Sequence, residues 1–130
     1  MSRTMEGAGF QPRGTMFALL GVTGRPVSLG VEVATSIRAR LLGWLGRVQP
    51  PPGRGLWIAP CDAVHTIAMR FPIDLVFVSR AGLVLRIDAR VRPWRARVCL
   101  GAYSVIELPA GEAERLGLRA GDHLERRSVA

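Results

Sequence analysis

One short segment gathers most of the residue types that could do chemistry, since Cys61, Asp62, His65 and Thr66 all lie within residues 61–66. Cys61 and His65 are four positions apart, so a helical turn would place both on one face. An imidazole beside a thiol is the arrangement that activates a cysteine nucleophile. Enzymes of this kind usually draw the two residues from distant parts of the sequence. The spacing therefore favours the other interpretation, in which Cys61 is a small buried residue and His65 hydrogen-bonds to the backbone.

A metal centre is the second chemistry that these residue types could support. It would need three or four ligands at suitable spacing. The candidate ligands are Cys61, His65, Cys99 and His123. They are scattered along the chain, and none of the paired motifs CxxC, HxH or HExxH is present. We predict no metal site and no cofactor.

Two carboxylates interrupt apolar runs farther along the chain. Asp74 follows Ile73 at the start of one run, and Glu107 lies inside another. An ionised carboxylate that faces a core is costly unless it is paired or hydrogen-bonded. We expect Asp74 to bind loop amides or to pair with Arg70, in preference to acting as a general base. If His65 joined both carboxylates in one cavity, a binding or acid–base site would result.

These residues together predict a polar pocket around residues 61–69. We expect its ligand-binding side chains to be Cys61, His65, Thr66, Met69, Asp74 and Glu107. The leading hypothesis is a non-catalytic accessory domain that binds an unidentified small ligand or protein partner. The alternative is a small enzyme that uses Cys61 with His65.

The basic residues suggest a further alternative, in which the domain binds nucleic acid or an anionic surface. The formal net charge is +8, from 18 basic and 10 acidic residues. Interleaved arginine and aromatic side chains suit such partners. The predicted anion-binding residues are Arg86, Arg90, Arg92, Trp94 and Arg95. Every basic residue is Arg and none is Lys, which looks like a coding bias and makes nucleic acid the less favoured partner.

The length of 130 residues fits one domain. We expect residues 1–14 to be a disordered tail and residues 15–130 to form the domain. No apolar run approaches the ~20 residues that cross a bilayer, and none near the start could serve as a signal-peptide core. These features predict a cytoplasmic protein, in which two cysteines stay reduced.

Alternating apolar residues predict a mainly β (α+β) fold. The expected architecture is a small, partly closed antiparallel β-barrel of six or seven short strands with two short helices. The helices are expected at residues 35–46 and 109–116. Turns at residues 24–26 and 80–82 predict two hairpins. Strands are expected at residues 16–22, 27–34, 56–59, 73–78, 83–91, 104–108 and 123–127.

Three segments also resemble a known family. They are TSIRARLLGWLG at 35–46, HTIAMRFPIDLVFVSRAG at 65–82 and VIELPAGEAERLGLRAGDHL at 105–124. Their order and spacing are similar to those of the DUF192 family, small bacterial and archaeal domains without an established activity. The resemblance covers about residues 27–126 and implies a strand-rich fold but no reaction. It also carries a faint implication of a pilus or secretion partner, because related members are sometimes encoded beside such genes.

Overall fold

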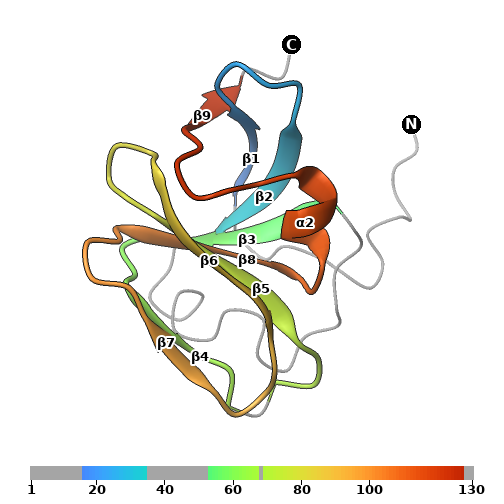
Figure 1. Ribbon diagram of the computed structural model, residues 1–130, viewed down its shortest axis with the longest axis vertical. Helices are drawn as coiled ribbons and strands as arrows, with labels where there is room; N and C mark the ends of the chain where they lie inside the picture. The colour runs from blue at the N-terminus through green and yellow to red at the C-terminus, as the bar shows by residue number, and fades with distance from the viewer. Residues whose placement is uncertain (1–15, 35–52, 68, 128–130) are drawn as a thin grey trace.

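The structure, a computed structural model, describes residues 16–34, 53–67 and 69–127 (Figure 1). Nine strands and one short helix form in this part of the chain. The strands are β1 (Met16–Val22), β2 (Ser28–Ala34), β3 (Arg54–Ile58), β4 (Ala63–His65), β5 (Ile73–Val78), β6 (Val84–Val91), β7 (Ala96–Val98), β8 (Ser104–Pro109) and β9 (Leu124–Arg127), and the helix is α2 (Glu112–Leu116).

Seven strands make one curled sheet in the order β6-β5-β8-β3-β2-β1-β9, and β4 pairs with β7 separately. We call the β4–β7 pair the ribbon. The edge strands of the large sheet approach each other where Leu83 forms a bridge with His123. The barrel is nevertheless open, so the mainly β prediction is confirmed and the partly closed barrel is corrected to a half-barrel (Figure 1).

The antiparallel prediction also fails at one strand pair. β2 and β3 are parallel, with Gly30 opposite Arg54 and Ala34 opposite Ile58. Parallel neighbours need a long crossover connection, and the chain between these strands is long enough to supply one. The seven strands expected from the sequence did not include β4 and β7, because each of these is only three residues long.

The described residues contain one helix, α2, which lies within the predicted segment 109–116. Gly111 and Gly117 flank it with φ of 89° and 73°, the left-handed values that glycine adopts without strain. The other predicted helix, at 35–46, and the predicted tail, at 1–14, lie outside the described residues. No helix among the described residues has the length and apolar character needed to cross a bilayer.

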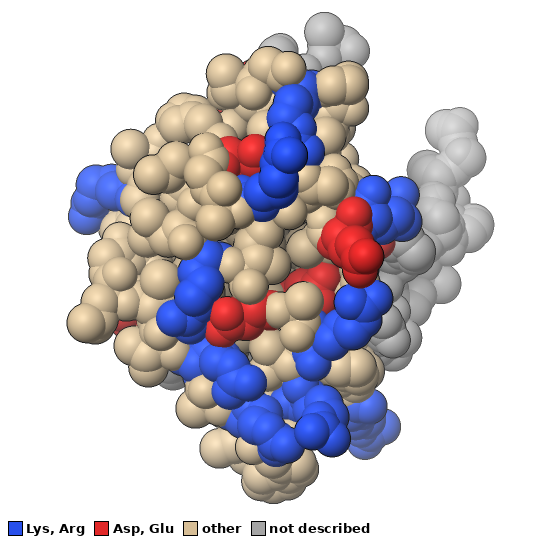
Figure 2. All heavy atoms as spheres, in the orientation of Figure 1, with Lys and Arg blue, Asp and Glu red and all other residues tan. Residues whose placement is uncertain are grey.

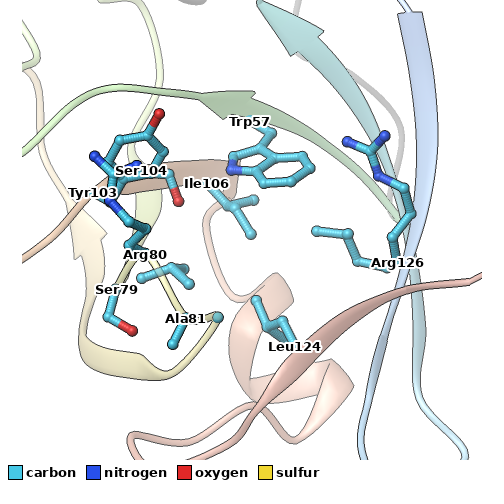
Figure 3. Close-up of a pocket in the computed structure, with 12 residues that line it drawn as sticks. Trp57, Ser79, Arg80, Ala81, Tyr103, Ser104, Ile106, Leu124 and Arg126 are labelled. Atoms are coloured by element: carbon cyan, nitrogen blue, oxygen red, sulfur yellow. The ribbon is translucent and has the colours of Figure 1, made fainter.

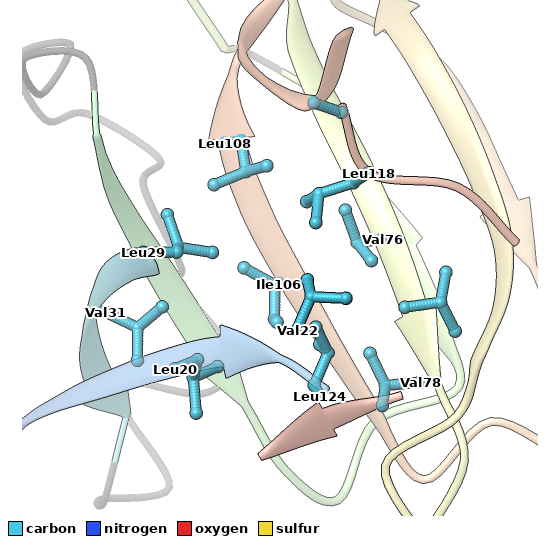
Figure 4. Packing of buried hydrophobic residues seen from close by; sticks show 12 residues of the cluster. Leu20, Val22, Leu29, Val31, Val76, Val78, Ile106, Leu108, Leu118 and Leu124 are labelled. Atoms are coloured by element: carbon cyan, nitrogen blue, oxygen red, sulfur yellow. The ribbon is translucent and has the colours of Figure 1, made fainter. Parts of the chain in front are cut away.

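Two hydrophobic cores lie on opposite faces of the large sheet. β5 and β8 are buried along their whole length because both of their faces are covered. The barrel core lies inside the curl (Figure 4) and includes Val76, Ile106 and Leu108. The ribbon-side core lies beneath β4 and β7 and includes Leu75, Phe77, Val105 and Cys99.

β6 departs from the clean alternation that its sequence suggests. Leu85 packs against the ribbon-side core whereas Ile87, two positions on, packs against the barrel core, although residues two apart share a face of a regular strand. The pairing of β6 with β5 slips twice, between Ile73 and Leu75 and between Phe77 and Val78, and Arg90 has a φ of 51°. These irregularities change which side chains of β6 face each side of the sheet.

Candidate functional site

The segment expected to form a polar pocket is extended and does not form a helical turn. Ala63–His65 is strand β4, paired with β7. Residues four apart in a strand are about 13 Å apart along the chain, so the spacing of Cys61 and His65 does not bring them together. His65 is exposed, and its Nδ1 accepts the amide of Ile67 at 3.3 Å. The helical turn that would have aligned the Cys61 thiol with the His65 imidazole does not form.

Two other residues of that segment hold the fold together. Thr66 is 1% exposed, and its hydroxyl donates to the carbonyl of Arg92 at 2.7 Å and accepts the amide of Arg95 at 2.8 Å. Met69 is buried in the ribbon-side core. Neither residue borders the cavity at Cys61.

Cys61 borders a shallow cavity of about 220 Å³, together with Pro60, Asp62, Ala102 and Tyr103. Its thiol donates to the carbonyl of Ala63 at 3.2 Å. Burial raises the pKa of the Cys61 thiol, and the nearby carboxylates of Glu107 and Asp62 raise it further, against the lowering effect of the Ala63 hydrogen bond. A raised pKa leaves less thiolate at neutral pH and so disfavours a nucleophile.

Asp74 and Glu107 lie on opposite faces of the sheet, so they do not share a cavity. Asp74 is opposite Leu108, which belongs to the barrel core, whereas Glu107 is opposite Leu75, which belongs to the ribbon-side core. Asp74 is fully buried, and its carboxylate accepts three backbone amides. Of the two structural roles expected for it, binding loop amides is the observed one.

The five predicted anion-binding residues fall into two groups. Arg86 stacks on the Phe77 ring and binds Asp88 through two hydrogen bonds of 3.0 Å. Arg90 pairs with Glu114 at 3.3 Å. Arg92, Trp94 and Arg95 are exposed in the loop between β6 and β7. These three residues have no carboxylate partner among the described residues, so an anionic partner could reach them without displacing an ion pair.

The four candidate metal ligands do not converge. His123 lies immediately before β9, where its Nδ1 is 3.3 Å from the hydroxyl of Thr23. Both cysteines are free thiols. Within the described ranges, no three side chains of His, Cys, Asp or Glu are grouped closely enough to hold a metal ion.

A cavity of about 230 Å³ opens at the end of the half-barrel, in a place that the sequence did not indicate. We call it the mouth cavity (Figure 3). It is formed by five strands of the large sheet and the turn between β5 and β6. Its lining residues are Leu20, Trp57, Val78, Ser79, Arg80, Ala81, Gly82, Tyr103, Ser104, Ile106, Leu124 and Arg126.

Arginine and aromatic side chains are paired at this cavity. The guanidinium carbon of Arg126 lies 5.2 Å from the ring centroid of Trp57, and that of Arg80 lies 4.1 Å from the ring centroid of Tyr103. Neither guanidinium contacts a carboxylate among the described residues. Of the described residues, no Asp or Glu lines the cavity, and the charged side chains among them, Arg80 and Arg126, are both positive.

The strand register explains how these residues meet. Arg126 is opposite Leu20, and residues that pair in this way place their side chains on the same face of a sheet. The indole nitrogen of Trp57 is buried and has no hydrogen-bond partner among the described residues. Gly82 has a φ of 94°, and an added Cβ would lie 2.7 Å from the carbonyl oxygen of Leu124. The turn at the cavity therefore requires glycine.

Sequence reasoning missed this site although one signal for it was present. The alternation in the last strand puts Leu124 and Arg126 on the same face, which marks Arg126 as an arginine near the core. Arg80 was assigned only to a turn, and Trp57 only to a buried strand. The pattern of a single strand does not show which other strands bring their residues to the same place.

Two solved structures are similar to this chain over most of its length. One, from Sinorhizobium meliloti 1021 and described provisionally as a transcription regulator, has a TM-score of 0.78 at 24% identity and covers 86% of this chain and 95% of its own. The other, a protein of unknown function from Novosphingobium aromaticivorans DSM 12444, has a TM-score of 0.74 at 21% identity and covers 95% of this chain and 99% of its own. At these identities the likeness shows the fold alone.

The comparison with curated proteins finds no match. The family model for DUF192, described as "Uncharacterized ACR", matches residues 19–126. This match spans most of the chain, and it includes nearly all of the sheet, α2 and the residues that line the mouth cavity. The chain therefore belongs to the DUF192 family.

Proposed function

We propose that this protein is a binding module whose mouth cavity takes a small anionic ligand with an apolar body, such as a small carboxylate. The observation that carries the proposal is the pair of arginines, Arg80 and Arg126, at a cavity to which the described part of the chain contributes no acidic side chain. We favour this site over the pocket expected around residues 61–69, since of the six ligand-binding side chains expected there Cys61 is the one that lines the shallow cavity beside Tyr103.

The walls of the mouth cavity suit the apolar part of such a ligand. Leu20, Val78 and Ile106 extend the barrel core to the cavity, and Trp57 adds an aromatic surface. Ligand sites commonly combine apolar walls with a few well-placed polar groups. A volume of about 230 Å³ is below the roughly 300 Å³ of the smallest drug-sized pockets, which favours a small ligand.

The positive charge at the mouth cavity suits the anionic group of such a ligand. A guanidinium binds a carboxylate through hydrogen bonds that are shorter and stronger than neutral ones. Stacking on Trp57 and Tyr103 restricts the two arginine side chains, so less side-chain entropy is lost when a ligand binds. The hydroxyl groups of Ser79 and Ser104 are further polar groups in the lining.

The test is a titration of the full chain with acetate, benzoate and phenylacetate, followed by two-dimensional NMR of the backbone amides. We expect benzoate and phenylacetate to shift the amides of residues 79–82 and 104 at millimolar concentration. The neutral compound benzamide should bind at least about tenfold more weakly, because it lacks the charge that the arginines recognise.

Arginine variants locate the site. Arg80→Ala and Arg126→Ala should each weaken benzoate binding by roughly fivefold to tenfold, while the matched variant Arg119→Ala, which alters an exposed arginine outside the cavity, should not change it. Three results would contradict the proposal: no shifts with any of the carboxylates, shifts confined to other residues, or equal binding of benzoate and benzamide.

A further inference from the structure

We propose that the ribbon docks the protein onto an anionic lipid bilayer. This inference is independent of the mouth cavity, since Figure 1 places β4 and β7 at the end of the molecule opposite β9. The surface involved, which we call the ribbon face, consists of exposed side chains of the ribbon and of the loops beside it. Its members are Ile67, Arg70, Arg92, Trp94, Arg95, Val98 and Leu100.

The ribbon face gathers most of the large apolar side chains that the described part of the chain exposes. Six such residues are exposed, and four of them belong to this face. Trp94, Val98 and Leu100 are 64%, 53% and 86% exposed. Scattered single apolar residues are normal on a surface, but a group of them beside polar residues marks an interaction site.

The pairing of the ribbon explains why these side chains point outward. Val64 and Arg97 are opposite each other and partly buried, and Val64 packs on the ribbon-side core. The neighbouring pairs, Ala63 with Val98 and His65 with Ala96, therefore face the solvent. Trp94 and Leu100 lie beyond the two ends of β7, about 20 Å apart if the chain is extended.

The charge of the ribbon face fits an anionic surface. Arg70, Arg92 and Arg95 are exposed and contact no carboxylate among the described residues. Asp62 lies at the end of the ribbon away from Trp94. Figure 2 shows arginine side chains gathered at the lower end of the visible face, the end where the ribbon lies in Figure 1. The acidic side chains in that view lie nearer the middle.

The loop that carries Trp94 is already ordered. The amide of Trp94 donates to the carbonyl of Thr66 at 2.9 Å, and the amide of Thr66 donates to the carbonyl of Arg95 at 2.7 Å. Trp94 also has a φ of 65°, which is unusual for a residue with a side chain. These backbone contacts order the loop from which the exposed indole projects, so docking does not have to order the loop.

The mixture of side chains favours a bilayer over a nucleic acid. Tryptophan and arginine are suited to the boundary between lipid headgroups and acyl chains, and arginines near anionic lipids are attracted to the surface. Single-stranded nucleic acid is bound through aromatic side chains that stack on bases. Ile67, Val98 and Leu100 are aliphatic and do not stack, whereas they gain from entering the acyl region.

Vesicle flotation of the full chain tests the proposal. We expect the protein to float with vesicles of phosphatidylserine and phosphatidylcholine, to remain behind with phosphatidylcholine alone, and to be released by added salt. Arg92→Ala with Arg95→Ala should lower the partition coefficient about 20- to 30-fold, at roughly fivefold for each arginine.

A second double variant tests the apolar contribution. Trp94→Asn with Leu100→Ser should lower partitioning at least about tenfold, and Asn tolerates the left-handed backbone at position 94. The matched controls, Leu83→Ser and Arg119→Ala, change an exposed leucine and an exposed arginine elsewhere and should float like the unchanged protein.

Four results would overturn the proposal. They are no flotation with anionic vesicles, equal flotation with both kinds of vesicle, loss of flotation in the control variants, and full flotation of both double variants. Single-stranded DNA serves as the competing probe. If the ribbon-face variants abolish binding to an oligonucleotide while the unchanged protein ignores vesicles, the partner is a nucleic acid and the lipid proposal is wrong.

Discussion

The carboxylate of Asp74 accepts the backbone amide of Ala113 at 2.9 Å and so joins the fully buried strand β5 to the start of α2. Its other oxygen accepts the amides of Arg90, at 2.8 Å, and Gly111, at 3.2 Å. One side chain thus supplies the acceptors for the bulge of β6 and for the loop before α2. It does so from inside the sheet, where water cannot replace it.

Replacing Asp74 with Asn should destabilise the protein by about 2–4 kcal/mol, because one carboxylate acceptor becomes an amide donor that faces the amide of Ala113. Urea unfolding of the variant measures this difference. The matched variant Asp62→Asn changes an exposed aspartate and should remain within about 0.5 kcal/mol of the unchanged protein. If Asp74→Asn were also destabilised by no more than about 0.5 kcal/mol, these hydrogen bonds would not stabilise the fold.

Replacing Thr66 with Val should loosen the loop that presents Trp94. The variant keeps the shape of the side chain but removes the acceptor of the Arg95 amide and the donor to the Arg92 carbonyl. We expect a loss of about 1–2 kcal/mol and faster hydrogen exchange at the Arg95 amide. Thr66→Ser keeps the hydroxyl and should retain most of the protection. Unchanged exchange in the Val variant would contradict the assigned role.

Removing the charge of Asp122 should reduce the dependence of stability on acid pH. Burial works to raise the pKa of this carboxyl, but the Arg119 amide and the Arg25 guanidinium outweigh it, so the pKa lies below its ordinary value. Arg25 donates to both carboxylate oxygens, at 2.6 and 2.7 Å. The ionised Asp122 carboxylate contributes its full stabilisation above the pKa of about 4 that an aspartate has in the unfolded chain. This contribution is lost as the pH falls through the lower pKa that Asp122 has in the folded protein.

Asp122→Asn should therefore be less stable than the unchanged protein at neutral pH, and the gap should narrow as the pH falls below about 4. Thermal unfolding at several pH values measures the gap. Glu114→Gln, which alters a carboxylate that is 78% exposed, should not change the profile. A gap for Asp122→Asn that stays constant down to the lowest pH would contradict the prediction.

The Cys61 thiol should alkylate slowly at neutral pH. Burial, reinforced by nearby carboxylates, raises its pKa, and the thiolate is the reactive form. In a Cys99→Ala background, iodoacetamide labelling of the folded protein should accelerate only as the pH rises above the ordinary thiol pKa of about 8.5, and unfolding in urea should make labelling at neutral pH faster. Rapid labelling of the folded protein at pH 7 would instead support a reactive nucleophile and revive the enzyme hypothesis.

The sequence by itself determined the strands whose side chains alternate and whose turns are marked by glycine. The sequences of β2 and β6 alternate, and Gly24 and Gly82 mark the turns of the first hairpin, β1–β2, and the second, β5–β6. A period of two and a residue that tolerates positive φ are local properties of the chain. The placement of α2 before Gly117 is local for the same reason. The resemblance to DUF192 rested likewise on the order of residues along the chain.

Only the tertiary structure decided which of these elements meet. Asp74 and Glu107 are both carboxylates in buried strands, yet the register of β5 on β8 places them on opposite faces of the sheet. Arg80, Trp57 and Arg126 come from three distant segments and meet at one cavity because the sheet curls. A strand's own pattern fixes which of its residues share a face. Pairing between strands, which depends on contacts far apart in sequence, fixes what that face meets.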